Sequence, residues 1–170
     1  MNKSQYITFR KGRLLIIITG LFSVLMALPA MGQEPPPRPL TVTLQQDLSF
    51  GAFYHGAAGG TVAISPAGSR TFTGDIVLLT MGYTFSPAVY RLTGPPGTVV
   101  SLLKDTGVTL SGSNGGSLNL QIGDTTPLSP FVTPAGPLLL NVGGIITIGN
   151  SADNPPGNYS GTFDITFVQE

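Results

Sequence analysis

Apolar residues alternate with polar ones along much of this chain, and a period of two is the pattern of a pleated β-strand. The clearest case lies near the C-terminus. There Tyr159, Gly161, Phe163, Ile165 and Phe167 fall on one face, and Ser160, Thr162, Asp164 and Thr166 fall on the other. Successive side chains of a strand point to opposite faces, so such a segment buries one face and exposes the other.

Shorter apolar runs recur between turn signals. The other segments predicted as strands are Leu40–Leu44, Thr61–Ser65, Thr71–Leu79, Ala88–Thr93, Thr98–Leu103, Val108–Leu110, Leu118–Ile122, Leu138–Val142 and Ile145–Ile148. Turns are expected at pairs and clusters such as Gly59-Gly60, Gly94-Pro95-Pro96-Gly97, Gly143-Gly144 and Asn154-Pro155-Pro156-Gly157. Their spacing of roughly 8–12 residues is typical of a sandwich or barrel. The fold class predicted is all-β, an immunoglobulin-like antiparallel β-sandwich.

Two further expectations concern local structure. The segments that start at Gly59-Gly60 and Gly143-Gly144 look alike, and two hairpins with the same turn chemistry explain this better than an internal repeat. The stretch Asp124–Gly136 holds three prolines and is expected to form a loop.

The N-terminus has the three parts of a signal peptide. A basic segment up to Arg13 precedes an apolar run, Leu14–Leu28, and small residues follow at Ala30 and Gly32. The run of about 15 residues is shorter than the roughly 20 that a membrane-spanning helix needs. We therefore expect residues 1–32 to be a signal peptide that is removed, residues 33–39 to be a proline-rich spacer, and residues 40–170 to form a single β-sandwich domain. The expected location is the periplasm, the outer surface or the extracellular space.

Composition narrows the function. The sequence has no cysteine, so neither a disulfide nor a lipoprotein anchor is available, and the domain must be stabilised by its apolar core. Past Gly32 there are four basic and eight acidic residues, a net charge of −4. This balance offers no basic surface for nucleic acid, and we expect no nucleic-acid partner.

No catalytic constellation stands out, and the chain is predicted not to be an enzyme. The only histidine, His55, is expected in a solvated glycine-rich loop, without a second histidine or a cysteine to complete a zinc site. Asn150, Asp153 and Asn154 place three oxygen ligands in one loop and are weak calcium candidates. Asx residues also serve turns by bonding their own backbone, which is the preferred interpretation. No cofactor is expected.

Three segments together carry a family resemblance. They run Leu48-Ser49-Phe50-Gly51, then Gly59-Gly60-Thr61-Val62-Ala63-Ile64-Ser65-Pro66, then Pro156-Gly157-Asn158-Tyr159-Ser160-Gly161-Thr162-Phe163. In this order and spacing they resemble an exported bacterial family known as domain of unknown function 4402, over about Leu40 to Val168. That family is similar in turn to spore-coat U and common-pilus subunits. The residues singled out as its structural motif are Leu48, Phe50, Gly51, Gly60, Pro156, Gly157, Tyr159 and Gly161.

Physical roles can be expected for part of this motif. Pro156-Gly157 suits a turn, and Tyr159 then enters the core with its hydroxyl tied back to a loop, as at a tyrosine corner. Gly161 marks a close approach of backbone or a bulge.

The resemblance implies a non-catalytic structural or adhesive protein of the cell surface, such as a pilus-like subunit. Its partners would be further copies or other surface subunits, joined by β-strand pairing. Leu40, Val42 and Leu44 would then form either the domain's own first strand or a donor arm. The spacer Gln33–Pro39 cannot donate a strand, because it holds four prolines and no large apolar side chain.

The alternative function is a self-contained secreted module that binds carbohydrate or matrix. Aromatic residues exposed on one loop face would favour it, and the loop-placed candidates are Tyr54, Tyr83, Phe85 and Phe131.

Overall fold

Strands follow one another along the whole of residues 38–170, the part of the chain that the computed structural model describes. The predicted signal peptide and all but the last two residues of the spacer lie outside this part. The first strands are β1 (Thr41–Gln46), β2 (Ser49–Phe50), β3 (Ala52–Ile64), β4 (Arg70–Leu79), β5 (Phe85–Ser86) and β6 (Ala88–Thr93). They are followed by β7 (Val99–Lys104), β8 (Val108–Gly112), β9 (Ser117–Thr126), β10 (Phe131–Val132), β11 (Leu138–Ile148), β12 (Tyr159–Ser160) and β13 (Ile165–Gln169).

The long strand β11 organises the largest sheet. One of its edges pairs first with β6 and then with β3, and its other edge pairs with β9. The sheet continues through β1 beside β6, β4 beside β3, and β8 and β12 beyond β9. A second sheet has the order β10-β7-β13, and β2 and β5 form a short third ladder. All these ladders are antiparallel.

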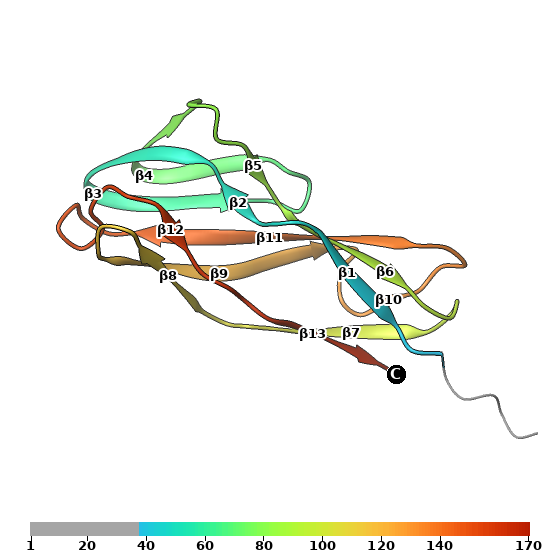
Figure 1. The fold of residues 1–170 in the computed structure, drawn as a ribbon. Coiled ribbons are helices and arrows are strands. Elements are labelled where there is room, and N and C mark those ends of the chain that lie inside the picture. Colours follow the sequence, from blue (N-terminus) through green and yellow to red (C-terminus); the bar gives the residue numbers. More distant parts are fainter. Residues whose placement is uncertain (1–37) are drawn as a thin grey trace, which may run out of the picture. The chain divides into compact units, whose positions relative to one another are not determined.

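The two main sheets cover each other only in part. In Figure 1 the sheet of β7, β10 and β13 lies toward the end of the large sheet that holds β1 and β6, while β3, β4, β8 and β12 lie toward the other end. The fully buried side chains come from both sheets and include Val62, Leu92, Leu140, Val142 and Ile146 of the large one and Val100 of the small one. The fold is therefore all-β and sandwich-like, and the prediction of antiparallel strands is confirmed.

The two glycine pairs are not turns, and this part of the prediction is wrong. Gly143 and Gly144 lie inside β11, and Gly59 and Gly60 lie inside β3. The two similar segments are neighbouring strands, with Ile148 opposite Gly60 and Gly144 opposite Ile64. A Cβ at Gly143 would lie 2.5 Å from the carbonyl oxygen of Ile64, so this glycine serves a close approach of backbones.

Two other segments differ from their predicted secondary structure. The C-terminal stretch forms two strands, because β12 pairs with β8 in the large sheet and β13 pairs with β7 in the small one. The predicted loop Asp124–Gly136 contributes its first residues to β9 and contains β10. Its prolines lie outside both of these strands.

Candidate functional site

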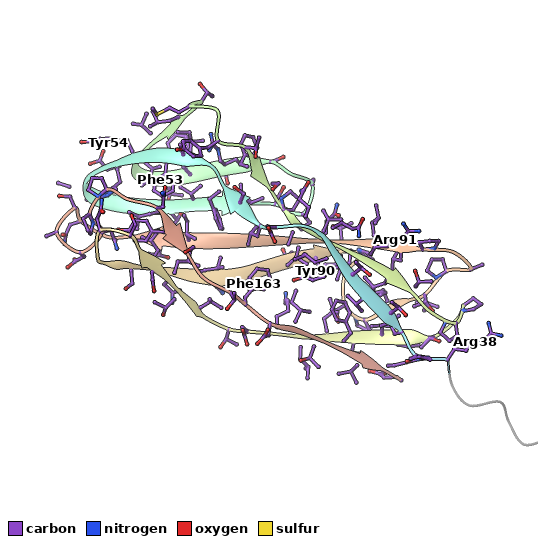
Figure 2. The ribbon with its side chains drawn as sticks, in the orientation of Figure 1. Arg38, Phe53, Tyr54, Tyr90, Arg91 and Phe163 are labelled. Carbon is purple, nitrogen blue, oxygen red and sulfur yellow. The ribbon has the colours of Figure 1, made fainter. Side chains whose placement is uncertain are left out.

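A groove of about 1040 Å³ opens where the small sheet stops covering the large one. One wall is built by residues 44 to 57 and the other by residues 155 to 163, and the two are far apart in the sequence. The floor is the apolar inner face of the large sheet, with Leu110, Leu118, Leu120, Ile146 and Ile148. Figure 2 labels Phe53, Tyr54, Tyr90 and Phe163, four of the aromatic residues that line the groove.

Arg70 holds the first wall in place. Its Nη1 donates hydrogen bonds to the carbonyl oxygens of Phe50 (3.0 Å) and Ala52 (3.3 Å), on either side of Gly51. Its guanidinium lies 4.4 Å from the centre of the Phe85 ring. Gly51 has a φ of +69°, and a Cβ there would lie 2.6 Å from Arg70 Nη1, so glycine is needed for the bend between β2 and β3. Leu48 and Phe50, the other motif residues here, pack half-buried against the core.

Tyr159 fixes the second wall as predicted. Its hydroxyl donates a hydrogen bond of 2.7 Å to the carbonyl oxygen of Pro155, four residues upstream. A Cβ at Gly161 would lie 2.9 Å from the carbonyl oxygen of Thr109, so this glycine allows the close approach expected of it. Gly157 follows Pro156 in the bend before β12, where a Cβ would lie 2.9 Å from the side-chain Oγ of Ser113.

Burial changes the ionisation of two tyrosines in the groove. It raises the pKa of Tyr159 above the ordinary value of 10.0. Burial is also the main cause of a raised pKa at Tyr90, where the negative charges of Asp47 and Asp164 add to the effect. Both pKa shifts favour the neutral phenol over the phenolate. Tyr159 needs this neutral form to donate its hydrogen bond.

Asn154 anchors the loop that leads into the second wall, and sequence reasoning did not give it this role. The residue is buried, its Oδ1 accepts from the N–H of Gly149 (2.5 Å), and its Nδ2 donates to the carbonyl oxygen of Ser117 (2.5 Å). His55 Nε2 donates to the carbonyl oxygen of Asn154 over 3.0 Å. The prediction of a solvated loop for His55 is wrong, since the residue lies in β3 and is half-buried.

The weak calcium candidates form the same loop. Asn150 Oδ1 accepts from the N–H groups of Ala152 (2.8 Å) and Asp153 (3.1 Å), and Asn150 Nδ2 donates to Asp153 Oδ2 (2.6 Å). These bonds are those of an Asx turn, the interpretation preferred from the sequence. Calcium binding by these residues stays the weaker alternative.

Val42 and Leu44 lie in β1, which pairs within the domain, and Leu40 stands directly before this strand. β1 pairs with β6 from Thr41 opposite Thr93 to Gln46 opposite Val89. Leu40 and Val42 are half-buried against the core, whereas Leu44 lines the groove and is 49% exposed.

The groove is nearly free of charge. Among its lining residues Asp47 carries the only carboxylate, and none is a lysine or arginine. Within residues 38–170 no cluster of three histidine, aspartate or glutamate side chains could hold a metal ion. Over the same residues, no helix is long and apolar enough to cross a membrane.

Of the aromatic candidates, two stand at the groove. Tyr54 and Tyr83 line it and are 62% and 64% exposed, and Met81 lines it beside them. Phe131 is buried in β10, so it does not fit the prediction of an exposed loop aromatic. Phe85 is 41% exposed, but it lies in β5 with Arg70 over its ring and does not line the groove.

Two strands that line the groove, β1 and β12, have one free edge each, and so does β13, which follows the second wall. Within the described residues β13 pairs only with β7, β12 only with β8, and β1 only with β6. A free edge presents unpaired N–H and C=O groups that can bind a further strand. Apolar side chains of such a strand, at every second position, would reach the floor.

Comparison with known proteins gives one family. The model of the family described as Domain of unknown function (DUF4402) matches residues 40–168. Searches of the curated proteins and of the solved structures found no match. The matched range includes both walls of the groove and its floor.

Proposed function

This chain belongs to the DUF4402 family of domains of unknown function, and we propose that it is an exported, non-catalytic structural protein of the cell surface. In this role it is a pilus-like subunit that joins another subunit by β-strand pairing. The observation that carries the proposal is the apolar groove bordered by strands with free edges.

The strand order supports an immunoglobulin-like build with one position open. In such sandwiches strands A, B, E and D form one sheet, and C, F and G form the other. The order β1-β6-β11-β9 matches the first sheet, and β7 beside β13 matches C and F. Within residues 38–170, no strand occupies the place of G, on the free edge of β13.

The tyrosine corner supports the same alignment of strands. In immunoglobulin-like domains this tyrosine stands near the start of strand F, and its hydroxyl bonds to the backbone a few residues upstream. Tyr159 stands shortly before β13 and bonds to the carbonyl oxygen of Pro155. On this alignment the groove lies where strand G would complete the sandwich, which is where a partner's strand would bind.

Export rests on the sequence. The basic segment, apolar run and small residues of positions 1–32 have the order of a signal peptide. A protein secreted in this way and built around an open groove suits assembly outside the cytoplasm, where strand exchange between subunits builds surface fibres.

The proposal is tested in the organism that makes the protein. Protease added to intact cells is expected to remove it, and electrophoresis without heating, blotted for this protein, is expected to show ladders of its complexes with other subunits that collapse to its single band on boiling. Leu44→Asp places a charge in the groove and is expected to abolish the ladders. Leu139→Asp, at a leucine of similar exposure in β11, is the control and leaves them intact. A protein that is found only in the cytoplasm as a monomer contradicts the proposal.

A second function is favoured by one observation. Tyr54, Met81 and Tyr83 are exposed at the groove, and aromatic rings beside a cleft suit the binding of a sugar face. On this alternative the domain is a secreted module for carbohydrate or matrix. Binding of a soluble polysaccharide that is lost in the double variant Tyr54→Ala, Tyr83→Ala would support it, and unchanged binding would dismiss it.

A further inference from the structure

We propose that this chain accepts a strand in its groove but gives none in return, so that the strand it binds comes from a different protein. The inference rests on the proposed function and specifies the direction of assembly. Three observations carry it: the undefended edge of β12 and β13, the chemistry of the groove, and the use that the chain makes of its own N-terminal strand.

The accepting edge lacks the usual protection against strand pairing. Natural edge strands carry charges, prolines or bulges that prevent uncontrolled pairing. From Tyr159 to Gln169 the sequence contains one charged residue, Asp164, and no proline. Residues 161 to 164 belong to no strand, between the ladder with β8 and the ladder with β7. An added strand would pair with the free edge along this whole stretch.

The groove defines the chemistry of what it accepts. Its floor is leucine and isoleucine, and Phe50, Phe53 and Phe163 stand along its walls. A matching strand therefore carries apolar side chains at every second position, and threonine or serine between them on the solvent side. Asp47 is the only carboxylate in the lining, so a basic residue is favoured where the strand passes it and an acidic one is not.

The chain's own strand is not available for export to a neighbour. β1 is hydrogen-bonded to β6 along its length, and Gln46 Nε2 donates to the carbonyl oxygen of Pro87 (2.9 Å). Moving β1 to another copy would leave one edge of β6 without a paired strand. Ala88 and Leu92 of β6 are almost completely buried in the present arrangement. Before β1 lies the spacer Gln33–Pro39, whose four prolines lack the N–H donors of a ladder.

These observations together determine the partner's chemistry. It is a protein other than this one, with an extended segment of alternating apolar residues that is free to leave its own fold. Residues 33–46 would accordingly supply no strand to a further subunit.

Cysteine cross-linking tests both halves of the proposal, since the native chain has no cysteine that could interfere. Thr162→Cys places a thiol on the exposed face of the groove's second wall. The probe is a synthetic eleven-residue peptide (a strand of about 36 Å) in which valine or isoleucine alternates with threonine, with one threonine replaced by cysteine. A peptide of the same composition with its apolar residues in one block is the first control. Thr147→Cys, on the exposed face of β11, is the second.

To test donation, the exported Thr162→Cys protein is mixed with a Thr43→Cys protein, whose thiol lies on β1. The proposal predicts a disulfide between Thr162→Cys and the alternating peptide, none with either control, and no dimer in the mixture. Dimers in the mixture would overturn one-way acceptance and leave assembly by strand pairing standing. If neither the peptide nor the second protein is linked, the groove does not accept strands, and the proposed function fails with it. The unfolding transition of each variant shows beforehand that the fold is intact.

Discussion

The hydroxyl of Tyr159 has a well-defined role at the scale of single residues. It closes the bend before β12 by donating to the carbonyl oxygen of Pro155, and this holds the second wall of the groove. The sequence allowed this role to be predicted, because a tyrosine two residues after Pro-Gly, at the start of an alternating strand, has the position of a tyrosine corner. It gave no such signal for Arg70 or Asn154, which donate to the backbone carbonyls of Phe50 and Ser117, far from them along the chain.

Removal of this hydroxyl is expected to weaken the fold without changing its shape. Tyr159→Phe keeps the ring and loses one hydrogen bond, so the free energy of unfolding should fall by about 1 kcal/mol. Urea unfolding followed by circular dichroism measures it. Tyr54→Phe, at a tyrosine that is mostly exposed, is the control and should change nothing measurable. Equal effects of the two substitutions would show that the hydroxyl of Tyr159 contributes no more to the free energy of unfolding than that of an exposed tyrosine.

The raised pKa values of Tyr159 and Tyr90 predict a loss of stability in alkali. Because the folded pKa of each lies above the unfolded value of 10.0, the folded state holds its protons more tightly. Their contribution is complete below pH 10.0 and is lost as the pH rises from there through the folded pKa. Chemical unfolding measured between neutral pH and about pH 11 should show this decline. The decline should be shallower in Tyr159→Phe, and an equally steep decline in that variant would contradict the assignment.

At the scale of elements, glycine pairs were the main source of error in the predicted strands. Gly143-Gly144 and Gly59-Gly60 were expected to be turns, but both lie inside long strands that pair with each other. A glycine that frees the backbone for a turn and one that makes room for a neighbouring backbone look the same in a single sequence. The strands without such pairs were better predicted, and β6 has the bounds expected of it.

The close approach at Gly143 can be tested directly. Gly143→Ala would place a Cβ 2.5 Å from the carbonyl oxygen of Ile64, and overpacking of this kind costs about 1–3 kcal/mol. The midpoint of urea unfolding should fall accordingly. Gly136→Ala is the matched control, because no atom lies within 4 Å of the added Cβ. If Gly143 were in a hairpin turn open to solvent, the two variants would behave alike.

The position of β1 is tested by a substitution that keeps its shape. Val42 is half-buried against the core, so Val42→Thr buries a hydroxyl and should lower the free energy of unfolding by about 1–3 kcal/mol. Thr43→Val changes the exposed face of the same strand and should stay within about 0.5 kcal/mol. A donor arm that is not part of its own domain would make both substitutions neutral in the isolated protein.

At the scale of the whole molecule, the groove arises from the strand order. Its walls come from residues 44–57 and 155–163, and its floor from the strands between them. The alternation of apolar residues predicted most of these strands and the sandwich-like class, and three sequence segments carried the resemblance to the family that the comparison confirms. The sequence could not reveal the groove, because which edge of a strand stays free depends on pairings between distant segments. A strand that is paired on both edges would show the same alternation as Ile165–Phe167.

Amide hydrogen exchange of β13, followed by NMR, tests the open edge most directly. In an antiparallel ladder alternate N–H groups point to opposite sides, so only every second amide of Ile165–Gln169 can bond to β7. We predict slow exchange at these amides and fast exchange at the others, and slow exchange throughout the part of β11 that is paired on both edges. Addition of the alternating peptide should slow the fast amides of β13. Slow exchange at every amide of β13 in the protein alone, or no change with the peptide, would contradict an open strand position.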